Sequence, residues 1–362
     1  MKFNRPPANR GIALMMVLIV VMVFAGMAWL FANSMKVEIK LARNNSFDAD
    51  FEWAARSGVE VARWVLANDS TGPFAQSDSA LNKWAGGPGD TNGPLAGVDL
   101  SHIELGDNVV LSIKIVDNES KFNINRAPPE ILNQALTQIG VDASLVPTIR
   151  DSIIDWRDPD HSELPNGAEK DFYERQNPPY RCKNGPIDDL TELMLINGVT
   201  PAMYWGSRIT GAQRPVLNRP VNARSALEEP IYEIGFVDLF TAMSSGQLNL
   251  NTAKAEAFLV LPMFDQADAE AIVQARSMPG AGMINGNGEG NVAPLLSHAD
   301  PRLASSPQLV AKLQMWQPYL TFKSLVFEAT ITARIGGQSR TCVATLRRNG
   351  PTDVQVLGFW WK

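Results

Sequence analysis

The chain has 362 residues, of which 45% are hydrophobic, and its formal net charge is −6. A chain of this length and apolar content can bury a sizeable core, which excludes a wholly disordered protein. The acidic balance disfavours nucleic-acid binding, because phosphate backbones are bound by clustered cations. The chain has three histidines and two cysteines without close spacing, so a zinc centre is not expected.

The first predicted element is an uncharged apolar helix over residues 12–34. Such a helix is long enough to cross a hydrocarbon layer of roughly 30 Å. Lys2, Arg5 and Arg10 precede it, so its amino-terminal side is expected to face the cytoplasm. Small residues at its end loosely fit a signal-peptide cleavage site, which leaves a secreted protein as an alternative.

The helical pattern continues without proline through residues 35–67. Apolar residues recur every three or four positions there, and charged residues take the other faces. The apolar positions are Phe47, Phe51, Ala55, Val59 and Ala62. We therefore predict one helix, half in lipid and half projecting from it, which argues against cleavage at the end of the apolar stretch.

A short basic leader, an apolar helix directly after Gly11 and an amphipathic extension resemble the type IV pilin-like proteins. The resemblance implies that residues 1–11 are a leader peptide, that prepilin peptidase cuts between Gly11 and Ile12, and that Ile12 is then N-methylated. Most of this family carry a glutamate where this chain has Met16. That glutamate usually pairs with the amino terminus of the neighbouring subunit, so its absence suits a subunit at a tip. The omission resembles the K-type minor pseudopilins of type II secretion systems, the general secretion pathway protein K family.

The middle of the chain predicts a head with a helical insertion. Residues 108–116 alternate apolar and polar side chains, as expected of a half-buried strand. The segments FNINRA at 122–127 and LNLNTA at 248–253 each precede an apolar helix and form a weak internal repeat. The expected divisions are 68–125 for the first part of the head, 126–245 for an inserted helical domain, 246–317 for the second NxN segment with a helical hairpin, and 318–362 for a carboxy-terminal sheet.

Five carboxylates gather in the segment DWRDPDHSELPNGAEKDFY, residues 155–173. They are Asp155, Asp158, Asp160, Glu163 and Glu169. Prolines and a glycine interrupt regular structure there, so several oxygens can converge on a hard cation, although the spacing is not that of an EF-hand. A solvated acidic turn is the alternative. The segment resembles the K-type pseudopilin motif DWxDxD to GAExxxY, which implies calcium held by Asp158, Asp160 and Glu169, with Asp155 and Glu163 as further candidates.

Two predicted hairpins are similar to helix-hairpin-helix units that bind DNA phosphates through backbone amides. No lysine or arginine lies between Thr191 and Trp205, around the first hairpin, and Met263, Phe264 and Asp265 occupy the second. A packing role is therefore favoured over DNA binding. No nucleophile beside a base and no phosphate-binding glycine loop is evident, so an enzyme is not expected, and a hydrolase using the aspartates near 158 is a weak alternative.

The last part of the chain predicts three strands, over 325–335, 340–348 and 354–361. With 108–116 they can form an antiparallel sheet packed on the outer half of the long helix. The expected fold is α+β: a pilin-like long amino-terminal helix on an antiparallel sheet, with an inserted all-helical domain of helix-hairpin-helix or SAM-like type. Cys182 and Cys342 lie on the outer side, where either a disulfide or two buried thiols can form.

The resemblance implies a minor pseudopilin at the tip of a periplasmic pseudopilus, which supports export of folded proteins. It also implies a single-pass bacterial inner-membrane protein with a cytoplasmic amino terminus and a periplasmic head. Expected partners are the I-type and J-type minor pseudopilins, the inner-membrane secretion platform, prepilin peptidase and membrane lipid, without nucleic acid. The alternative is a type IV pilus tip subunit or a DNA-binding pilin-like protein.

Overall fold

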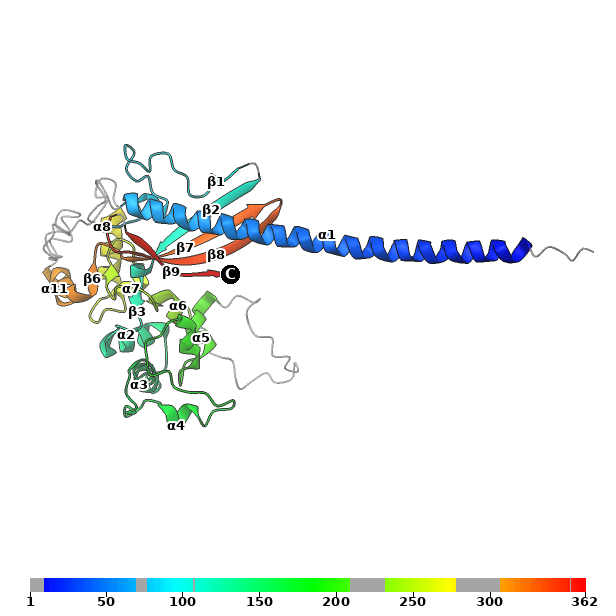
Figure 1. Ribbon diagram of the computed structural model, residues 1–362. Helices are drawn as coiled ribbons and strands as arrows, with labels where there is room; N and C mark the ends of the chain where they lie inside the picture. The colour runs from blue at the N-terminus through cyan, green and yellow to red at the C-terminus, as the bar shows by residue number, and fades with distance from the viewer. Residues whose placement is uncertain (1–9, 70–76, 107, 209–231, 278–306, 352) are drawn as a thin grey trace, which may run out of the picture.

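A computed structural model describes residues 10–69, 77–106, 108–208, 232–277, 307–351 and 353–362. One helix, α1 (Arg10–Asp69), accounts for 60 residues. Its stretch from Leu14 to Lys40 is apolar and long enough to span a membrane, and none of that stretch is buried in the structure. Figure 1 shows this part projecting away from the head. The prediction of one continuous helix is confirmed.

The second half of α1 packs on an antiparallel sheet of five strands in the order β1-β2-β7-β8-β9. The strands are β1 (Ile103–Glu104), β2 (Val109–Asp117), β7 (Val326–Ile335), β8 (Gln338–Arg348) and β9 (Val354–Trp361). Alternate side chains of β7, including Phe327 and Ile331, are buried against the helix. At Gly58 the helix α1 lies very close to β7, because a Cβ atom added there would lie 2.5 Å from Cγ2 of Ile331.

Short helices and two small parallel strand pairs form a second unit with its own hydrophobic core. Its α-helices are α2 (Pro129–Ile139), α3 (Val146–Arg157), α4 (Lys170–Tyr173), α5 (Pro201–Trp205), α6 (Phe236–Leu239), α7 (Ala255–Phe258), α8 (Gln266–Ser277) and α11 (Pro307–Met315). The strand pairs are β3 (Phe122–Asn123) with β4 (Phe240–Thr241), and β5 (Leu248–Asn249) with β6 (Leu320–Thr321). The 3-10 turns are η2 (Lys83–Ala85), η3 (Asn118–Ser120), η4 (Leu190–Leu195), η5 (Gly206–Arg208) and η6 (Gln317–Tyr319).

The two NxN segments have the same local geometry. In each, the first asparagine accepts a hydrogen bond from the backbone N–H two residues later, at 2.8 Å for Asn123 and 2.9 Å for Asn249. An arginine near the end of the second following helix donates to the carbonyl of the residue after that asparagine, Arg157 in the first copy and Arg276 in the second. The segments predicted as a weak repeat therefore share a strand, an Asx turn and a helix pair.

Buried polar side chains join the sheet to the helical unit. Asp117, the last residue of β2, accepts hydrogen bonds from Ser324 Oγ at 2.6 Å and from Asn249 Nδ2 at 3.2 Å. Glu119 accepts one from the backbone N–H of Val326 at 3.1 Å. Burial is the main cause that raises the pKa of both Asp117 and Glu119. These bonds tie the point where the chain leaves the sheet to the point where it returns.

A buried ion pair lies in the same junction. The guanidinium of Arg348, at the end of β8, contacts the carboxylate of Asp78, and the two side chains are 2% and 1% exposed. Arg348 also donates to the carbonyl of Ser324 at 2.7 Å, and its guanidinium carbon lies 5.0 Å from the centre of the Phe327 ring. Three separate segments of the chain, at Asp78, at Ser324 to Phe327 and at Arg348, therefore hold this buried charged pair in place.

Several local predictions differ from the structure. The four-strand prediction missed β1, because two residues carry no periodic signal. The sequence pattern predicts helices over 188–195 and 253–261, but the first is the 3-10 turn η4 and the second shortens to α7. Leu325, the first residue of the strand predicted over 325–335, lies before β7 and is partly exposed. The glycine-rich sequence over 280–294 predicts a loop, and these residues lie outside the described part of the chain.

Candidate functional site

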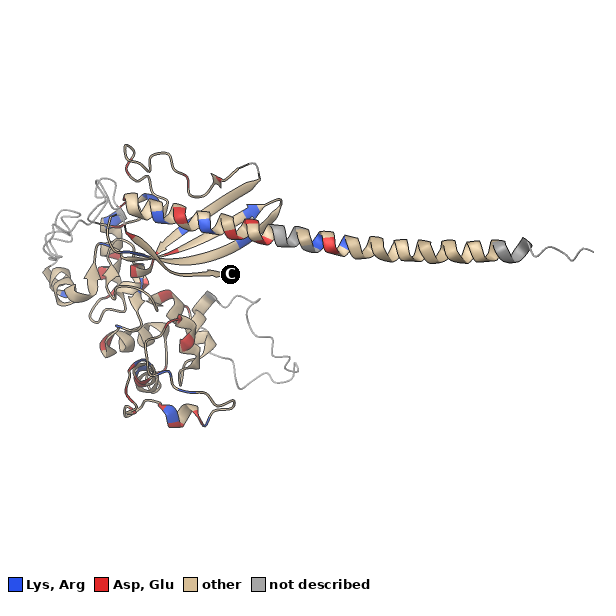
Figure 2. Cartoon of the chain, viewed as in Figure 1, with Lys and Arg blue, Asp and Glu red and all other residues tan. Residues whose placement is uncertain are grey.

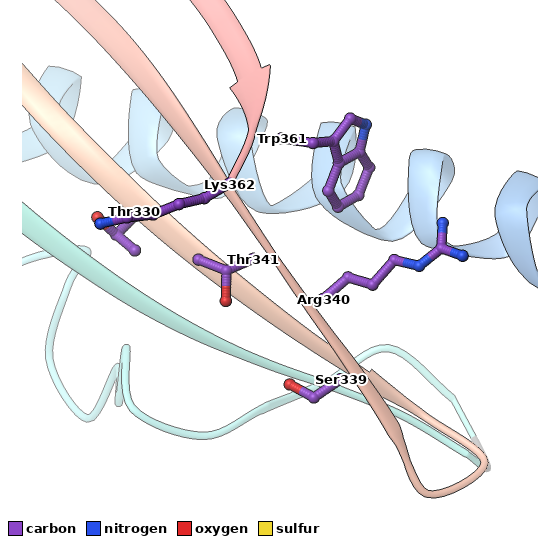
Figure 3. A pocket seen from close by; sticks show the side chains of 6 residues that line it. All are labelled: Thr330, Ser339, Arg340, Thr341, Trp361 and Lys362. Atoms are coloured by element: carbon purple, nitrogen blue, oxygen red, sulfur yellow. The ribbon is translucent and has the colours of Figure 1, made fainter. Parts of the chain in front are cut away.

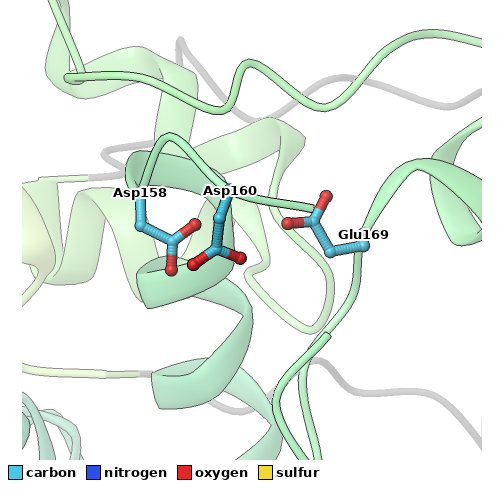
Figure 4. A group of neighbouring side chains, drawn as sticks. All are labelled: Asp158, Asp160 and Glu169. Atoms are coloured by element: carbon cyan, nitrogen blue, oxygen red, sulfur yellow. The ribbon is translucent and has the colours of Figure 1, made fainter. Parts of the chain in front are cut away.

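Three of the five predicted carboxylates come together in the loop after α3. One carboxylate oxygen from each of Asp158, Asp160 and Glu169 lies within 4.8 Å of the other two. Figure 4 shows the carboxylates of Asp158 and Asp160 side by side, with that of Glu169 directed toward them. Asp158 directly follows α3 and Glu169 caps α4, so these two helices fix both ends of the loop.

Asp158 is the least satisfied of the three carboxylates. Its Oδ1 atom is buried and has no hydrogen-bond partner among the described residues. Burial, and then the charges of Asp160 and Glu169, raise the pKa of Asp158. A buried acceptor that faces two like charges is costly unless a cation or proton compensates it. The donor set and this orphaned oxygen fit a hard cation such as Ca²⁺.

The two remaining predicted ligands do not join this group. Asp155 lies in the last turn of α3, fully buried, and accepts a hydrogen bond from Ala168 N–H at 2.9 Å and another from Leu164 N–H at 3.2 Å. Burial raises the pKa of Asp155 to about 6. Its carboxylate folds the loop back on the helix, so its predicted role as a ligand is corrected to a structural one. Glu163 is exposed on the loop and is likewise outside the group.

Asn184 belongs to the site, although the sequence analysis did not select it. Its amide nitrogen lies 3.2 Å from both carboxylate oxygens of Glu169 and also donates to the carbonyl of Asp160. Its backbone φ is +46°, a conformation that asparagine tolerates better than most residues. The Asn-Gly pair at 184–185 is a turn signal that could have drawn attention to it.

The two cysteines are free thiols in separate cores. Cys342 is fully buried between the sheet and α1, whereas Cys182 is half-buried against the helical unit. The disulfide alternative is therefore corrected. Burial raises the pKa of each thiol to about 11, so neither is a reactive thiolate near neutral pH.

The expected cleavage site lies at the start of α1. The helix begins at Arg10, so Gly11 and Ile12 are in its first turn. Continuation of the helix from this point through residue 69 leaves no loop after the apolar stretch, which does not favour signal-peptide cleavage near residue 34. Processing at Gly11 remains a prediction.

Comparison with known proteins gives one consistent result. A family model for type II secretion system protein K matches residues 110–206. Type II secretion system protein K of Klebsiella pneumoniae is 24% identical over 209 residues, which are 54% of this chain and 60% of that protein, less than two thirds of its length. The protein K of Pectobacterium carotovorum is 24% identical over 75% of this chain and 81% of its own length. That of Pseudomonas aeruginosa is 25% identical over 75% and 74%.

A solved structure shares the fold. It is the crystal structure of the GspK-GspI-GspJ complex from the type 2 secretion system of enterotoxigenic Escherichia coli, with a TM-score of 0.61 at 17% sequence identity. The match covers 89% of this chain and 99% of the matched one. In sequence the chain is therefore similar to type II secretion system protein K, and in fold it is similar to a chain of the GspK-GspI-GspJ complex.

Proposed function

We propose that this chain forms the tip of a periplasmic pseudopilus and supports export of folded proteins. The observation that carries the proposal is the pair of environments around α1. Its apolar half is exposed, and its other half packs on the sheet of the head. A helix with these two environments can anchor the subunit in lipid and later pack against other subunit helices. Gly26 has nothing near its Cβ position, so a second helix can approach it closely.

Two features favour a tip over a shaft. Position 16 is methionine, so the carboxylate that would bind a neighbour's amino terminus is missing. The helical unit adds bulk beside the sheet, at the end of the head away from the membrane segment (Figure 1). A wide unit that recurred at every subunit would hinder a narrow filament, whereas a single copy at the end would not.

The partners follow from the same proposal. The matched structure is titled as a complex with GspI and GspJ, and we propose I-type and J-type minor pseudopilins as partners here. Prepilin peptidase, the inner-membrane platform and lipid complete the set, with the amino terminus cytoplasmic and the head periplasmic. The role is structural and non-enzymatic, and the inserted unit is of helix-hairpin-helix or SAM-like type.

A DNA-binding pilin-like protein is the second candidate, and two observations weigh against it. Figure 2 shows acidic and basic positions mixed over the head, with no basic stripe across its described part. The second hairpin presents Met263, which is 64% exposed at a backbone φ of +75°. An exposed methionine at a hairpin tip cannot attract phosphate as a lysine or a bare glycine turn does.

Leader removal tests the proposed function. Intact protein recovered from membranes is expected to lack residues 1–11 and to carry a methyl group on Ile12, as measured by intact mass. Gly11→Ala is expected to keep residues 1–11, because it changes the residue directly before the proposed cut. Gly26→Ala, in the same helix but away from the cut, is the matched control and should be processed like the unchanged protein.

Two masses would overturn the proposal. A wild-type chain that starts at Met35 would be a secreted soluble protein. A wild-type chain that still starts at Met1 would be a permanent membrane anchor. Cleavage of both variants at a bond other than the one between Gly11 and Ile12 would also overturn it.

We also propose that Asp158, Asp160 and Glu169 bind Ca²⁺. When bound, the ion would neutralise three converging carboxylates and tie the loop to the turn at Asn184. That amide now directs its nitrogen at Glu169, and the same amide turned over would present its oxygen instead. The chain would thus supply four side-chain ligands from two segments. Backbone oxygens or water would fill the remaining coordination positions of the ion.

Calcium at a hundredfold excess over its Kd is expected to stabilise the full-length chain by about 2.7 kcal/mol. Its melting temperature should therefore rise when calcium is added. Asp158→Asn is expected to weaken binding about tenfold or more, because it removes a charge from the least satisfied ligand. Binding should also weaken as pH falls from neutral, since the raised pKa of Asp158 lets protons compete. Calorimetric titration with CaCl₂ measures the calcium affinity of the variant and its dependence on pH, and thermal unfolding measures the melting temperature.

Glu163→Gln is the matched control, because it removes one negative charge from the same loop outside the ligand group. Its affinity for calcium should equal that of the unchanged chain. An equal loss in both variants would mean that the loop attracts cations only through its net charge.

A further inference from the structure

The outer edge of β9 has no strand beside it in the described part of the chain. The backbone N–H of Lys362 donates to the carbonyl of Thr341 on β8, at 2.9 Å. Backbone groups of successive residues in a strand point to opposite sides, so the N–H and C=O of Trp361 and Phe359 point away from the sheet. The edge therefore offers donors and acceptors to another chain.

This edge lacks the features that usually prevent pairing. The sequence of β9, VQVLGFWW, contains no charged residue and no proline. Val356, Leu357 and Trp360 are 41%, 47% and 46% exposed. Natural sheets usually protect an exposed edge with lysine, proline or a very short strand, and β1 at the opposite edge is only two residues long. An apolar edge of eight residues is an exception in this sheet.

The strand is held rigidly from behind by α1. The indole N–H of Trp361 donates to the carboxylate of Glu52 at 3.3 Å, and Nε of Arg63 donates to the carbonyl of Val354 at 2.7 Å. Both ends of β9 are thus fixed on one helix. A preformed strand loses little conformational entropy when it pairs, so its edge is ready for a partner.

A β-bulge limits the length of pairing. The register between β8 and β9 shifts at Thr345 and Leu346, which leaves Leu357 as the extra residue. The regular part of the edge therefore runs from Gly358 to Trp361. A bulge bends the strand and interrupts pairing, so the edge can accept a short strand but not a long ladder.

Beside this regular part lies a shallow hollow of about 700 Å³. Its lining residues are Thr330, Ser339, Arg340, Thr341, Trp361 and Lys362 (Figure 3). The Trp361 ring and the Arg340 side chain both extend toward α1 in that view. The hollow provides room for the side chains of a segment that continues past the edge.

We propose that the outer edge of β9, from Gly358 to Trp361, binds an extended segment of a neighbouring pseudopilin head as an added strand. The inference rests on the proposed function, which supplies pilin-like neighbours. An extended backbone is the chemical group that matches alternating N–H and C=O groups at strand spacing. Trp360 would contact apolar side chains of the incoming strand, and Leu357, at the bulge, would flank the end of that strand.

The test uses full-length chains co-expressed with I-type and J-type minor pseudopilins and purified in detergent. Leu357→Lys is expected to weaken the complex about tenfold, because it places a charge on the apolar edge. Leu105→Lys is the matched control, since Leu105 is 40% exposed beside the opposite edge strand. Hydrogen exchange should show new protection of the Phe359 and Trp361 amides in the wild-type complex.

Each other outcome has a distinct meaning. If the wild-type chain binds neither pseudopilin, the proposed function fails. If the complex forms, both lysine variants bind equally and the two amides stay unprotected, the edge proposal is wrong while the function stands. Protection in the isolated monomer, with a cross-link to residues 209–231, would assign the edge to this chain itself. Protection that depends on the concentration of this chain alone would assign it to a second copy, and either result overturns the proposal.

Discussion

Arg348→Met is expected to lower the free energy of unfolding by about 3–5 kcal/mol, because it leaves the buried Asp78 carboxylate without its cation. Both side chains are almost wholly buried, so water cannot replace the lost partner. The change also removes the hydrogen bond to the carbonyl of Ser324 and the cation over the Phe327 ring. Methionine keeps most of the apolar stem of arginine, so the loss comes mainly from removal of the guanidinium group.

Thermal unfolding of the full-length chain measures this effect. Arg347→Met is the matched control, because Arg347 is the neighbouring residue on β8 and is exposed. Its melting temperature should stay close to that of the unchanged protein. The double variant Asp78→Asn/Arg348→Met should recover part of the loss, since no unpaired charge remains. Equal effects of the two arginine changes would exclude a stabilising ion pair at this junction.

The elements with a long repeating pattern could be predicted from sequence. The apolar positions from Phe51 to Ala62 define the buried face of α1, and alternation in β7 identifies its core side. In both, a single local period determines which side chains are buried. Short elements carry no such period, so β1 and the two parallel pairs could not be found in this way.

The candidate metal site was only partly predictable. The sequence places five carboxylates in one segment, but the fold decides which of them face each other. Asp155 is removed from the group because two backbone N–H donors occupy its carboxylate. Asn184 enters from 15 residues beyond Glu169, through contacts that no local spacing encodes. The pair of Asp78 and Arg348 is more distant still, 270 residues apart.

Gly58→Val is the second change with a large expected effect, about 3 kcal/mol of destabilisation from overpacking. In an exposed helix a glycine is usually the weaker choice, and Gly→Ala gains up to about 1 kcal/mol. At Gly58 the opposite is expected, because the Cβ position lies 2.5 Å from Ile331 Cγ2 and 3.2 Å from its Cγ1. Ile331 is branched at Cβ and fully buried, so it cannot turn away cheaply. The helix must then lift from the sheet on which it packs.

The comparison of Gly58→Ala with Ser57→Ala identifies the cause. Ser57 is one residue away and only half-buried, so its change to alanine should be neutral or slightly stabilising through helix propensity. Gly58→Ala should instead destabilise, and Gly58→Val should destabilise more, because the added atoms meet the β7 side chain. Ile331→Ala in the Gly58→Val background should recover part of the loss, since it makes room for the new methyl groups. Stabilisation by Gly58→Ala in thermal unfolding would show that the helix does not approach the sheet this closely, and that glycine at this position does not set the helix-to-sheet distance.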